Sequence, residues 1–322
     1  MQENLREQTF EKMDLNLLTI AQRATLSLTI TNSFTNALSK ISQIEALADK
    51  IDGSAEFTTD EKAQNRNFSI IGLTSISEHL LNEILYRVLI SYPKKLGSKQ
   101  FAVDELLDEG SILELFYKKA NQKVLDLAYG KFERFVRQFS ETVELTAPLS
   151  HEIIGNVNEV KCTRDCIIHS DGKANDQYFG KAGQQARVSR NGEKLDTTLA
   201  YFHSSVATFT RFITDIRDAL PSKYADSTKS YVFKQMWEAT CLNRRVKFDQ
   251  AWTIIDGSMV RPVKLDNDFG FSSSELVMHD LFRHMYSYDR FPVDFPLLFK
   301  KWKPQSNEHQ IAISWLDNQF YF

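Results

Sequence analysis

The sequence predicts an all-α protein: a helical bundle with a helical extension before it and a small, mostly helical domain after it. Three observations lead to this prediction. Apolar residues recur at helical spacing over long segments. Only 12 of the 322 residues are glycine and 7 are proline, too few for a many-turned β-sandwich or a glycine-looped nucleotide fold. The 23 Phe, 11 Tyr and 4 Trp supply bulky side chains for a sizeable core.

The first half of the chain is predicted to be helical almost throughout. Apolar residues at helical spacing over residues 13–50 predict one long helix or two joined ones, and Gly53 follows as a stop signal. A second helix is expected over residues 68–90, ended by Pro93. A third is expected over residues 111–143, where Lys and Arg crowd the face opposite the apolar stripe.

The next segments combine helix signals with turn signals. Gly130 marks a kink or a division in the third helix. Ser150 opens a fourth helix, which runs down to an Asp-Gly turn signal at 171–172. Residues 188–195 contain Asn-Gly, which is typical of a two-residue hairpin turn, and are expected to form two short polar strands.

The last helix of the bundle and a change in amino-acid composition after it set the predicted domain boundaries. Asp196 is the expected N-cap of a helix over residues 197–220. Residues 221–230 read as a linker, and all four Trp lie beyond it. The predicted divisions are a helical extension over residues 1–56, a helical bundle over residues 57–220 and a small helical domain over residues 231–322.

Charge and cysteine content narrow the class of protein. A net charge of −3 excludes a globally basic, histone-like binder but leaves room for a local basic cleft. No run approaches 18 apolar residues, and the first residues lack a basic and then apolar secretory signal, so no membrane partner is expected. Three cysteines do not make a disulfide framework. A cytoplasmic location is expected.

The most informative string is Arg-Asp-Cys-Ile-Ile-His, which runs from Arg164 to His169 at the polar end of the fourth helix. Arginine is always charged and presents a planar fork of donors that suits phosphate oxygens. Histidine moves protons at cellular pH. Together the two suit cleavage of RNA by its own ribose 2′-hydroxyl, which needs an acid or base and a stabiliser of charge but no metal.

The spacing of this pair restricts how it acts. Five residues along an α-helix turn through about 500°, so the side chains of Arg164 and His169 diverge by roughly 140°. They converge on one phosphate only if the helix ends between them, or if a second copy of the chain supplies half of the site.

The arrangement resembles the HEPN family (higher eukaryotes and prokaryotes nucleotide-binding), small up-down helical bundles with an Arg-x4–6-His ribonuclease motif. Residues 164–169 fit the motif, and Asp165 stands where the family often has a polar residue directly after the Arg. The resemblance covers roughly residues 65–220. One branch of the family has Tyr two residues after the His; this chain has Asp171 there, so regulation through that Tyr is not expected.

The resemblance implies a metal-independent endoribonuclease that needs no cofactor. It also implies a homodimer in which the two motifs face each other, with RNA as the substrate. Many relatives act as toxins or as abortive-infection effectors against phage. In these terms His169 is the general acid or base, Arg164 binds the scissile phosphate, and Asp165 orients the Arg or shapes the pocket.

Further residues are candidates for supporting roles. Glu78 and His79 on the second helix are candidates for orienting Arg164 or His169. Basic residues that flank the motif are candidates for RNA contacts: Lys173, Lys181, Arg187 and Arg190, with Lys194 nearby. A basic face on the third helix is a second candidate RNA track, made of Lys118, Lys119, Lys123, Lys131, Arg134 and Arg137.

Two alternatives stay open at this point. In the first, the bundle is a catalytically inactive dimerisation or adaptor module that binds a protein or nucleotide partner. In the second, Cys162, Cys166 and His169, which share one helix face, bind zinc with Cys241 or another His as the fourth ligand. Their spacing matches no established zinc motif, and core packing is the expected role of the cysteines. The last domain is a candidate site for a regulatory protein or trigger, and its Trp residues are expected in its core.

Overall fold

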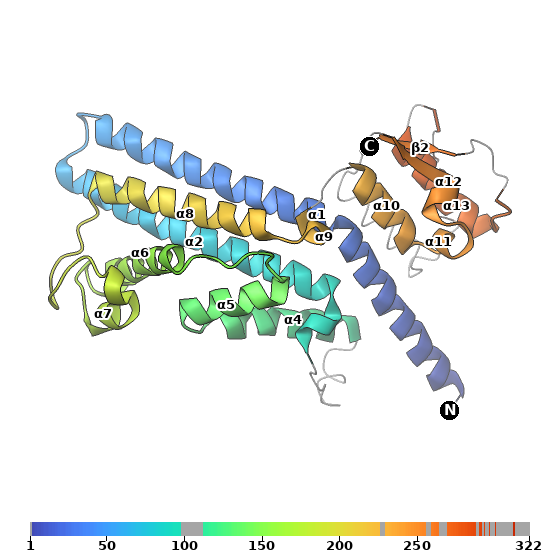
Figure 1. Cartoon of the computed structure of the whole chain (residues 1–322), viewed down its shortest axis with the longest axis horizontal. Coiled ribbons are helices and arrows are strands. Elements are labelled where there is room, and N and C mark those ends of the chain that lie inside the picture. Colours follow the sequence, from blue (N-terminus) through green and yellow to red (C-terminus); the bar gives the residue numbers. More distant parts are fainter. Residues whose placement is uncertain are drawn as a thin grey trace. The chain divides into compact units, whose positions relative to one another are not determined.

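The computed structural model describes residues 2–97, 112–225, 229–255, 259–263 and 269–287, with single positions between 290 and 312. The described chain is mostly helical and contains one two-stranded sheet, which confirms the all-α prediction at the level of fold class (Figure 1). It divides into two compact units. The bundle unit comprises Ile30–Val88 and Ala120–Ala225; the second unit comprises Met1–Thr29, Leu89–Lys119 and Asp226–Phe322. The domain boundaries expected from the sequence stay predictions.

Two long helices open the chain. Helix α1 (Gln2–Gly53) is a single helix that ends at the expected glycine. Helix α2 (Thr59–Ser91) begins nine residues before the expected start, because Thr58 and Glu61 form a reciprocal capping box ahead of the apolar stripe. Figure 1 shows α1 and α2 joined at one end of the bundle. The two helices are in contact where Ile44 of α1 lies directly against Gly72 of α2.

The predicted third helix is divided where the sequence suggested. The structure has α4 (Ile112–Ala128) and α5 (Phe132–Val143), with a break at Gly130 because glycine disfavours the helical state. Between α2 and α4 a short 3-10 helix, η1, covers Pro93–Leu96.

Helix α6 (His151–His169) has the expected N-cap, because the Ser150 hydroxyl accepts from the amide of Ile153. The end of α6 has the expected turn. The backbones of Asp171 and Gly172 are left-handed, and the amides of Ser170 and Gly172 both donate to the carbonyl of Cys166. Helix α6 therefore stops abruptly just after His169.

The segment after α6 differs from the prediction. It contains α7 (Asp176–Ala182) and the 3-10 helix η2 (Gly183–Gln185), but residues 188–195 form no hairpin strands. Instead, Lys194 bridges to Lys173, and the amide of Leu195 donates to the carbonyl of Gly172 at 2.8 Å. The loop therefore pairs with the turn after α6 rather than with itself.

Helix α8 (Leu199–Ala219) closes the bundle, with Thr198 rather than Asp196 as its N-cap. Its His203 lies between Glu45 and Asp49 of α1, at 3.2 and 3.1 Å. A short helix, α9 (Ser222–Ala225), lies within the stretch that was expected to be a linker. The core of the bundle is aliphatic and aromatic; its fully buried side chains include Leu85, Val88, Phe139, Val157, Phe202, Phe209, Phe212 and Ile216.

The described part of the second unit beyond residue 228 is helical, with one addition that the sequence analysis missed. Its elements are α10 (Lys229–Ala239), α11 (Leu242–Arg245), α12 (Phe248–Ala251), β1 (Trp252–Ile255), β2 (Met259–Pro262) and α13 (Ser273–Tyr286). Strands β1 and β2 pair antiparallel. Trp237 and Trp252 are buried in the core, as expected. Trp302, Trp315 and the last five residues lie outside the described residues. Among the described helices, none has the length and apolarity to span a membrane.

His279 makes the stability of this second core depend on pH. The imidazole is buried among Trp237, Phe269 and Phe271, and burial, aided by the charge of Arg283, lowers its pKa to about 4. Between pH 7 and pH 5 the unfolded chain takes up a proton that the folded chain does not, so we expect a loss of about 2 kcal/mol of unfolding free energy. Urea unfolding at the two pH values, followed by Trp fluorescence, measures this loss of unfolding free energy.

This experiment reports on the second core because all four Trp lie beyond residue 230. His279→Gln and His279→Phe should each remove most of the difference between pH 7 and pH 5. A variant that keeps the full pH dependence would show that other groups cause it.

Candidate functional site

Arg164 and His169 both lie on α6, which is continuous through the two residues. The helix does not end between them, so the first of the two routes to convergence expected from the sequence is wrong for a single copy. Arg164 is directed toward α2, whereas His169 is exposed at the carboxyl end of α6. On a continuous helix these side chains diverge by roughly 140°. One copy therefore does not bring both groups to a single point.

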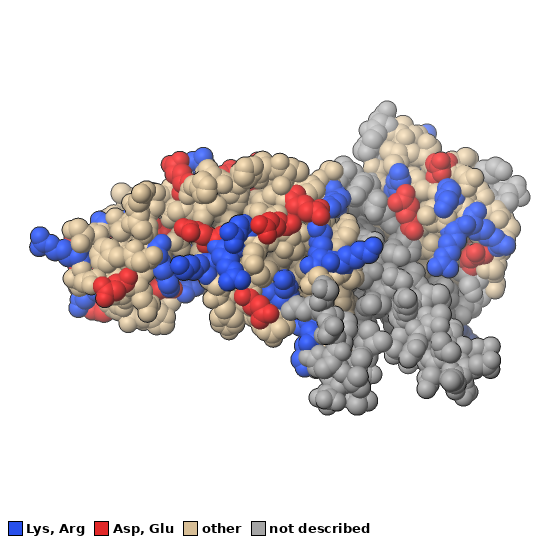
Figure 2. Space-filling model, turned by 60° about the horizontal axis from the view of Figure 1, so that its bottom comes forward, with Lys and Arg blue, Asp and Glu red and all other residues tan. Residues whose placement is uncertain are grey.

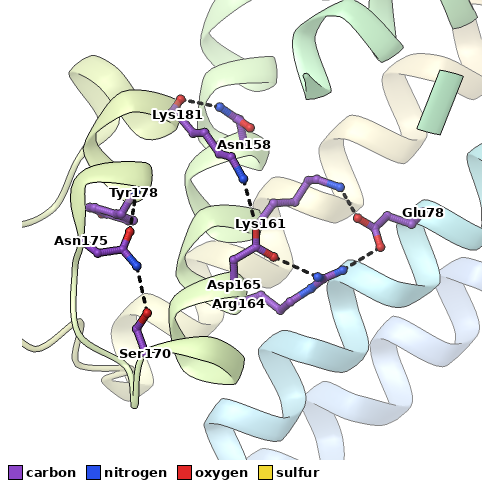
Figure 3. A network of polar contacts seen from close by, with 9 residues as sticks. All are labelled: Glu78, Asn158, Lys161, Arg164, Asp165, Ser170, Asn175, Tyr178 and Lys181. Atoms are coloured by element: carbon purple, nitrogen blue, oxygen red, sulfur yellow. Dashed lines mark hydrogen bonds and ion pairs between the residues drawn. The ribbon is translucent and has the colours of Figure 1, made fainter. Parts of the chain in front are cut away.

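Two carboxylates hold the guanidinium of Arg164. Its Nη2 donates to Oε2 of Glu78 at 2.8 Å, and its Nη1 donates to Oδ1 of Asp165 at 2.9 Å (Figure 3). Lys161, one turn earlier on α6, binds the other carboxylate oxygen of Glu78. The Arg164 side chain is 22% exposed, and its Nε is buried with no hydrogen-bond partner among the described residues. Arg164 is therefore fixed in direction while part of its surface faces solvent.

Lys181 of α7 lies near Arg164 because a hydrogen bond to its backbone carbonyl holds α7 in place. The side-chain amide of Asn158 on α6 donates from Nδ2 to the backbone carbonyl of Lys181 at 2.7 Å, which fixes α7 against α6. The ammonium of Lys181 then lies 3.5 Å from Oδ2 of Asp165, as Figure 3 shows. Asp165 thus bridges Arg164 and Lys181.

Two adjoining cavities open beside these residues. The larger, about 390 Å³, lies between α2, the turn joining α4 to α5, α6 and α7, and includes Arg164; we call it the Arg164 cleft. The smaller, about 230 Å³, lies between α6 and α7 and includes His169; we call it the His169 pocket. Cys162, Asp165 and Lys181 line both cavities. The two motif residues therefore flank one polar surface that has the Asp165–Lys181 ion pair at its middle.

The other residues proposed from the sequence fall into different places. Glu78 contacts Arg164, whereas the exposed His79 side chain points elsewhere and lies 3.9 Å from Glu83. Lys173 and Arg190 are exposed, and Lys173 lies 3.6 Å from Asp171. The structure thus brings Glu78 and Lys181 to Arg164, and does not bring His79 there.

Arg187 takes part in a network of hydrogen bonds around a buried carboxylate, and its RNA contact stays a prediction. Its Nε donates at 3.0 Å to Glu159, a carboxylate only 5% exposed, and its guanidinium stacks 3.5 Å over the ring of Tyr201. Glu159 also accepts from the hydroxyls of Tyr178, Tyr201 and Thr163. Burial raises the pKa of both tyrosines. The network ties the loop after α7 to α6 and α8 and occupies the guanidinium that a phosphate would need.

In the view of Figure 2, Lys and Arg alternate with Asp and Glu over the described part of the molecule. The second candidate RNA track, from the third predicted helix, consists of Lys118, Lys119, Lys123, Lys131, Arg134 and Arg137. Lys131 alone of that set lines the Arg164 cleft. The local cleft, rather than the face of the third predicted helix, is therefore the better candidate for a nucleic-acid contact.

Two of the three cysteines are core residues. Cys162 and Cys166 are buried with Ala174, Tyr178 and Leu195. Burial raises the pKa of Cys162 to about 12 and raises that of Cys166 as well, so neither is a thiolate near neutrality. Among the described residues, no three His, Cys, Asp or Glu side chains are close enough to share a metal ion. The zinc alternative is not supported there.

Thiol labelling checks this burial. At pH 8 the thiols of Cys162 and Cys166 should react with a disulfide reagent at least about 100-fold more slowly in the folded chain than in urea, because the thiolate is the reacting form. The Cys241→Ser variant leaves only these two thiols to observe. Rapid labelling of both in the folded variant would contradict the buried placement of this face of α6.

Some site residues were not found from the sequence. Lys161 precedes Arg164 by three residues, so helical spacing alone places it on the same face. Asn82 and Tyr129 line the Arg164 cleft but have no sequence signal beyond, for Tyr129, its place beside the Gly130 break. No family model, curated protein or solved structure matches the chain. The function is therefore inferred from the site itself.

Proposed function

We propose that the protein is a metal-independent endoribonuclease of HEPN type, and that it acts as a toxin or as an abortive-infection effector against phage. One observation carries the proposal: Arg164, oriented by two carboxylates, and His169 line adjoining cavities that meet at the Asp165–Lys181 ion pair. A fixed guanidinium with a lysine close by suits an anionic phosphodiester, and an exposed imidazole suits proton transfer at its reacting oxygens.

The roles follow from the chemistry of the reaction. The imidazole of His169 takes the proton of a ribose 2′-hydroxyl or gives one to the leaving 5′-oxygen. The 2′-oxygen attacks phosphorus and the bond to the 5′-oxygen breaks, which leaves a 2′,3′-cyclic phosphate and a 5′-hydroxyl. Arg164 binds the non-bridging oxygens and stabilises their developing charge. Glu78 and Asp165 keep the guanidinium in position.

A second copy of the chain completes the proposed site. Because α6 is continuous, His169 of one copy is directed away from its own Arg164. A twofold contact between the ends of two α6 helices would instead place Arg164 of one copy beside His169 of the other. The exposed Ile168 next to His169 gives such a contact an apolar component. The second unit is proposed to bind a regulatory protein or trigger that restrains the activity.

Product analysis tests the proposal. Purified full-length protein is incubated with a mixed RNA in excess EDTA, and the ends of the fragments are identified. We expect cleavage with 2′,3′-cyclic phosphate and 5′-hydroxyl ends. Cleavage that stops in EDTA, or products with 5′-phosphates, would contradict a mechanism that uses the ribose hydroxyl without metal.

The second candidate function is a catalytically inactive adaptor that dimerises through the bundle. The observation that favours it is the pair of carboxylates on Arg164, which also suits a structural ion pair. Under this reading the chain forms dimers but leaves RNA intact in the same assay.

A further inference from the structure

We propose that the Arg164 cleft is a nucleobase subsite, which takes the base of the nucleotide next to the cleaved phosphate and so sets the sequence preference of the enzyme. The inference rests on the proposed RNA cleavage and deepens it. Its basis is that the two walls of the cleft differ in chemistry: one is apolar and aromatic, the other is polar and charged. A nucleotide has the same division between a flat base and an anionic phosphate.

The apolar wall comes from the turn that joins α4 to α5. Leu125, Ala128, Tyr129 and Phe132 line this side of the cleft. The side chain of Tyr129 is 88% exposed, although such a large ring gains from being covered. One side of the Phe132 ring is already occupied by Lys161 at 4.8 Å. Tyr129 is therefore the ring that is open for a base to stack on, which is how proteins bind unpaired bases.

The polar wall contains a side-chain amide whose oxygen lacks a hydrogen-bond partner among the described residues. Asn82 of α2 lines the cleft, and its Oδ1 is buried with no hydrogen-bond partner among the described residues. A buried polar atom without a partner costs free energy, which a hydrogen bond from a ligand recovers. The amide of asparagine has one acceptor and two donors, which suit the edge of a base. Because Asn82 lines the same cleft as Tyr129, we expect a small rotation of its amide to let it bind the edge of a base that stacks on Tyr129.

The charged part of that wall leads to the reaction centre. Lys161, Arg164 and Lys181 line the cleft, and Lys181 also lines the His169 pocket. Figure 3 shows these three cations close to one another. Because they line the same cleft as Tyr129 and Asn82, a base bound there would have its phosphate near them. The volume of about 390 Å³ is in the range of small-ligand sites. The scissile phosphate would then lie between Arg164 of this copy and His169 of the second copy.

Binding of an RNA that cannot be cut tests the subsite separately from catalysis. The probe is a set of short oligonucleotides with every ribose 2′-O-methylated, and binding to the full-length protein is measured by fluorescence anisotropy. Tyr129→Ala should weaken binding about tenfold, because a stacking ring is lost. Asn82→Leu should also weaken binding and reduce the difference between oligonucleotides of different base, without lowering thermal stability, since the orphaned oxygen is removed. Phe68→Ala is the control, because Phe68 is an aromatic residue of α2 that is 62% exposed and lies outside the cleft lining.

The outcomes separate this inference from the proposed function. If the oligonucleotides bind, the two cleft variants weaken binding and natural RNA stays uncut, the subsite stands and the endoribonuclease proposal fails. If natural RNA is cut but the cleft variants match wild type in binding and in sequence preference, the subsite is overturned while the endoribonuclease proposal stands. Equal losses in Phe68→Ala, or no binding by wild type, would also overturn the subsite.

Discussion

His169→Ala should slow RNA cleavage by about 100- to 10,000-fold, because that is the usual contribution of a residue that moves a proton in the transition state. The change should fall on kcat more than on KM, since the imidazole acts on the reacting bond and does not hold the rest of the RNA. His169 is exposed at the end of α6, so its truncation leaves the core intact and helix content by circular dichroism should stay the same.

A matched control lies on the same helix. His151 is the first residue of α6 and is also exposed, so His151→Ala removes an exposed histidine from the opposite end. Its cleavage rate should equal that of wild type. Equal rates for His169→Ala and wild type would remove His169 from the proposed mechanism.

Arg187→Met should destabilise the bundle unit by about 3–5 kcal/mol, because it leaves the buried carboxylate of Glu159 without its positive partner. The hydroxyls of Tyr178, Tyr201 and Thr163 still donate to Glu159, but none of them neutralises its charge. Urea unfolding followed by far-ultraviolet circular dichroism measures the loss. Trp fluorescence serves as an internal reference, since the bundle unit contains no Trp.

Arg190→Met is the control for this prediction. Arg190 is exposed in the same loop, and an exposed substitution away from a buried network costs within about 0.5 kcal/mol. If both variants lose the same stability, the Glu159 network does not hold the loop in place, and Arg187 stays among the candidate RNA contacts.

The helices were predicted correctly where a local sequence signal was sufficient to locate them. The apolar periodicity located the long helices, Gly130 marked the division between α4 and α5, and Ser150 marked the start of α6. The start of α2 was missed because its capping box at Thr58 and Glu61 precedes the apolar stripe by several residues. Hydrophobic patterns do not detect a helix end that is fixed by polar side chains.

Local structures that depend on contacts between residues distant in sequence could not be predicted from the sequence. The Asn-Gly turn in residues 188–195 was correctly placed, but its flanks pair with residues 172–174, and nothing in the loop itself specifies that partner. The short β1–β2 ladder of the second unit was missed for a similar reason, since four-residue strands leave almost no periodic pattern.

The candidate site shows the same division. A motif with fixed spacing selects Arg164, Asp165 and His169, but the use of Arg187 depends on Glu159, 28 residues away. The cleft wall at Tyr129 exists only because α5 packs beside α6. Residue types that suit RNA chemistry can thus be found in the sequence, while the assignment of each cation to structure or to substrate requires the fold.

The most direct test of the central claim uses two inactive variants in one dimer. Arg164→Ala and His169→Ala chains carry different affinity tags, are expressed together, and the mixed species is purified by both tags. If each active site takes Arg164 from one copy and His169 from the other, the mixed dimer keeps one intact site, and we expect about half of the wild-type cleavage rate. A mixed dimer as inactive as the two parent variants would contradict the claim that two copies share the site.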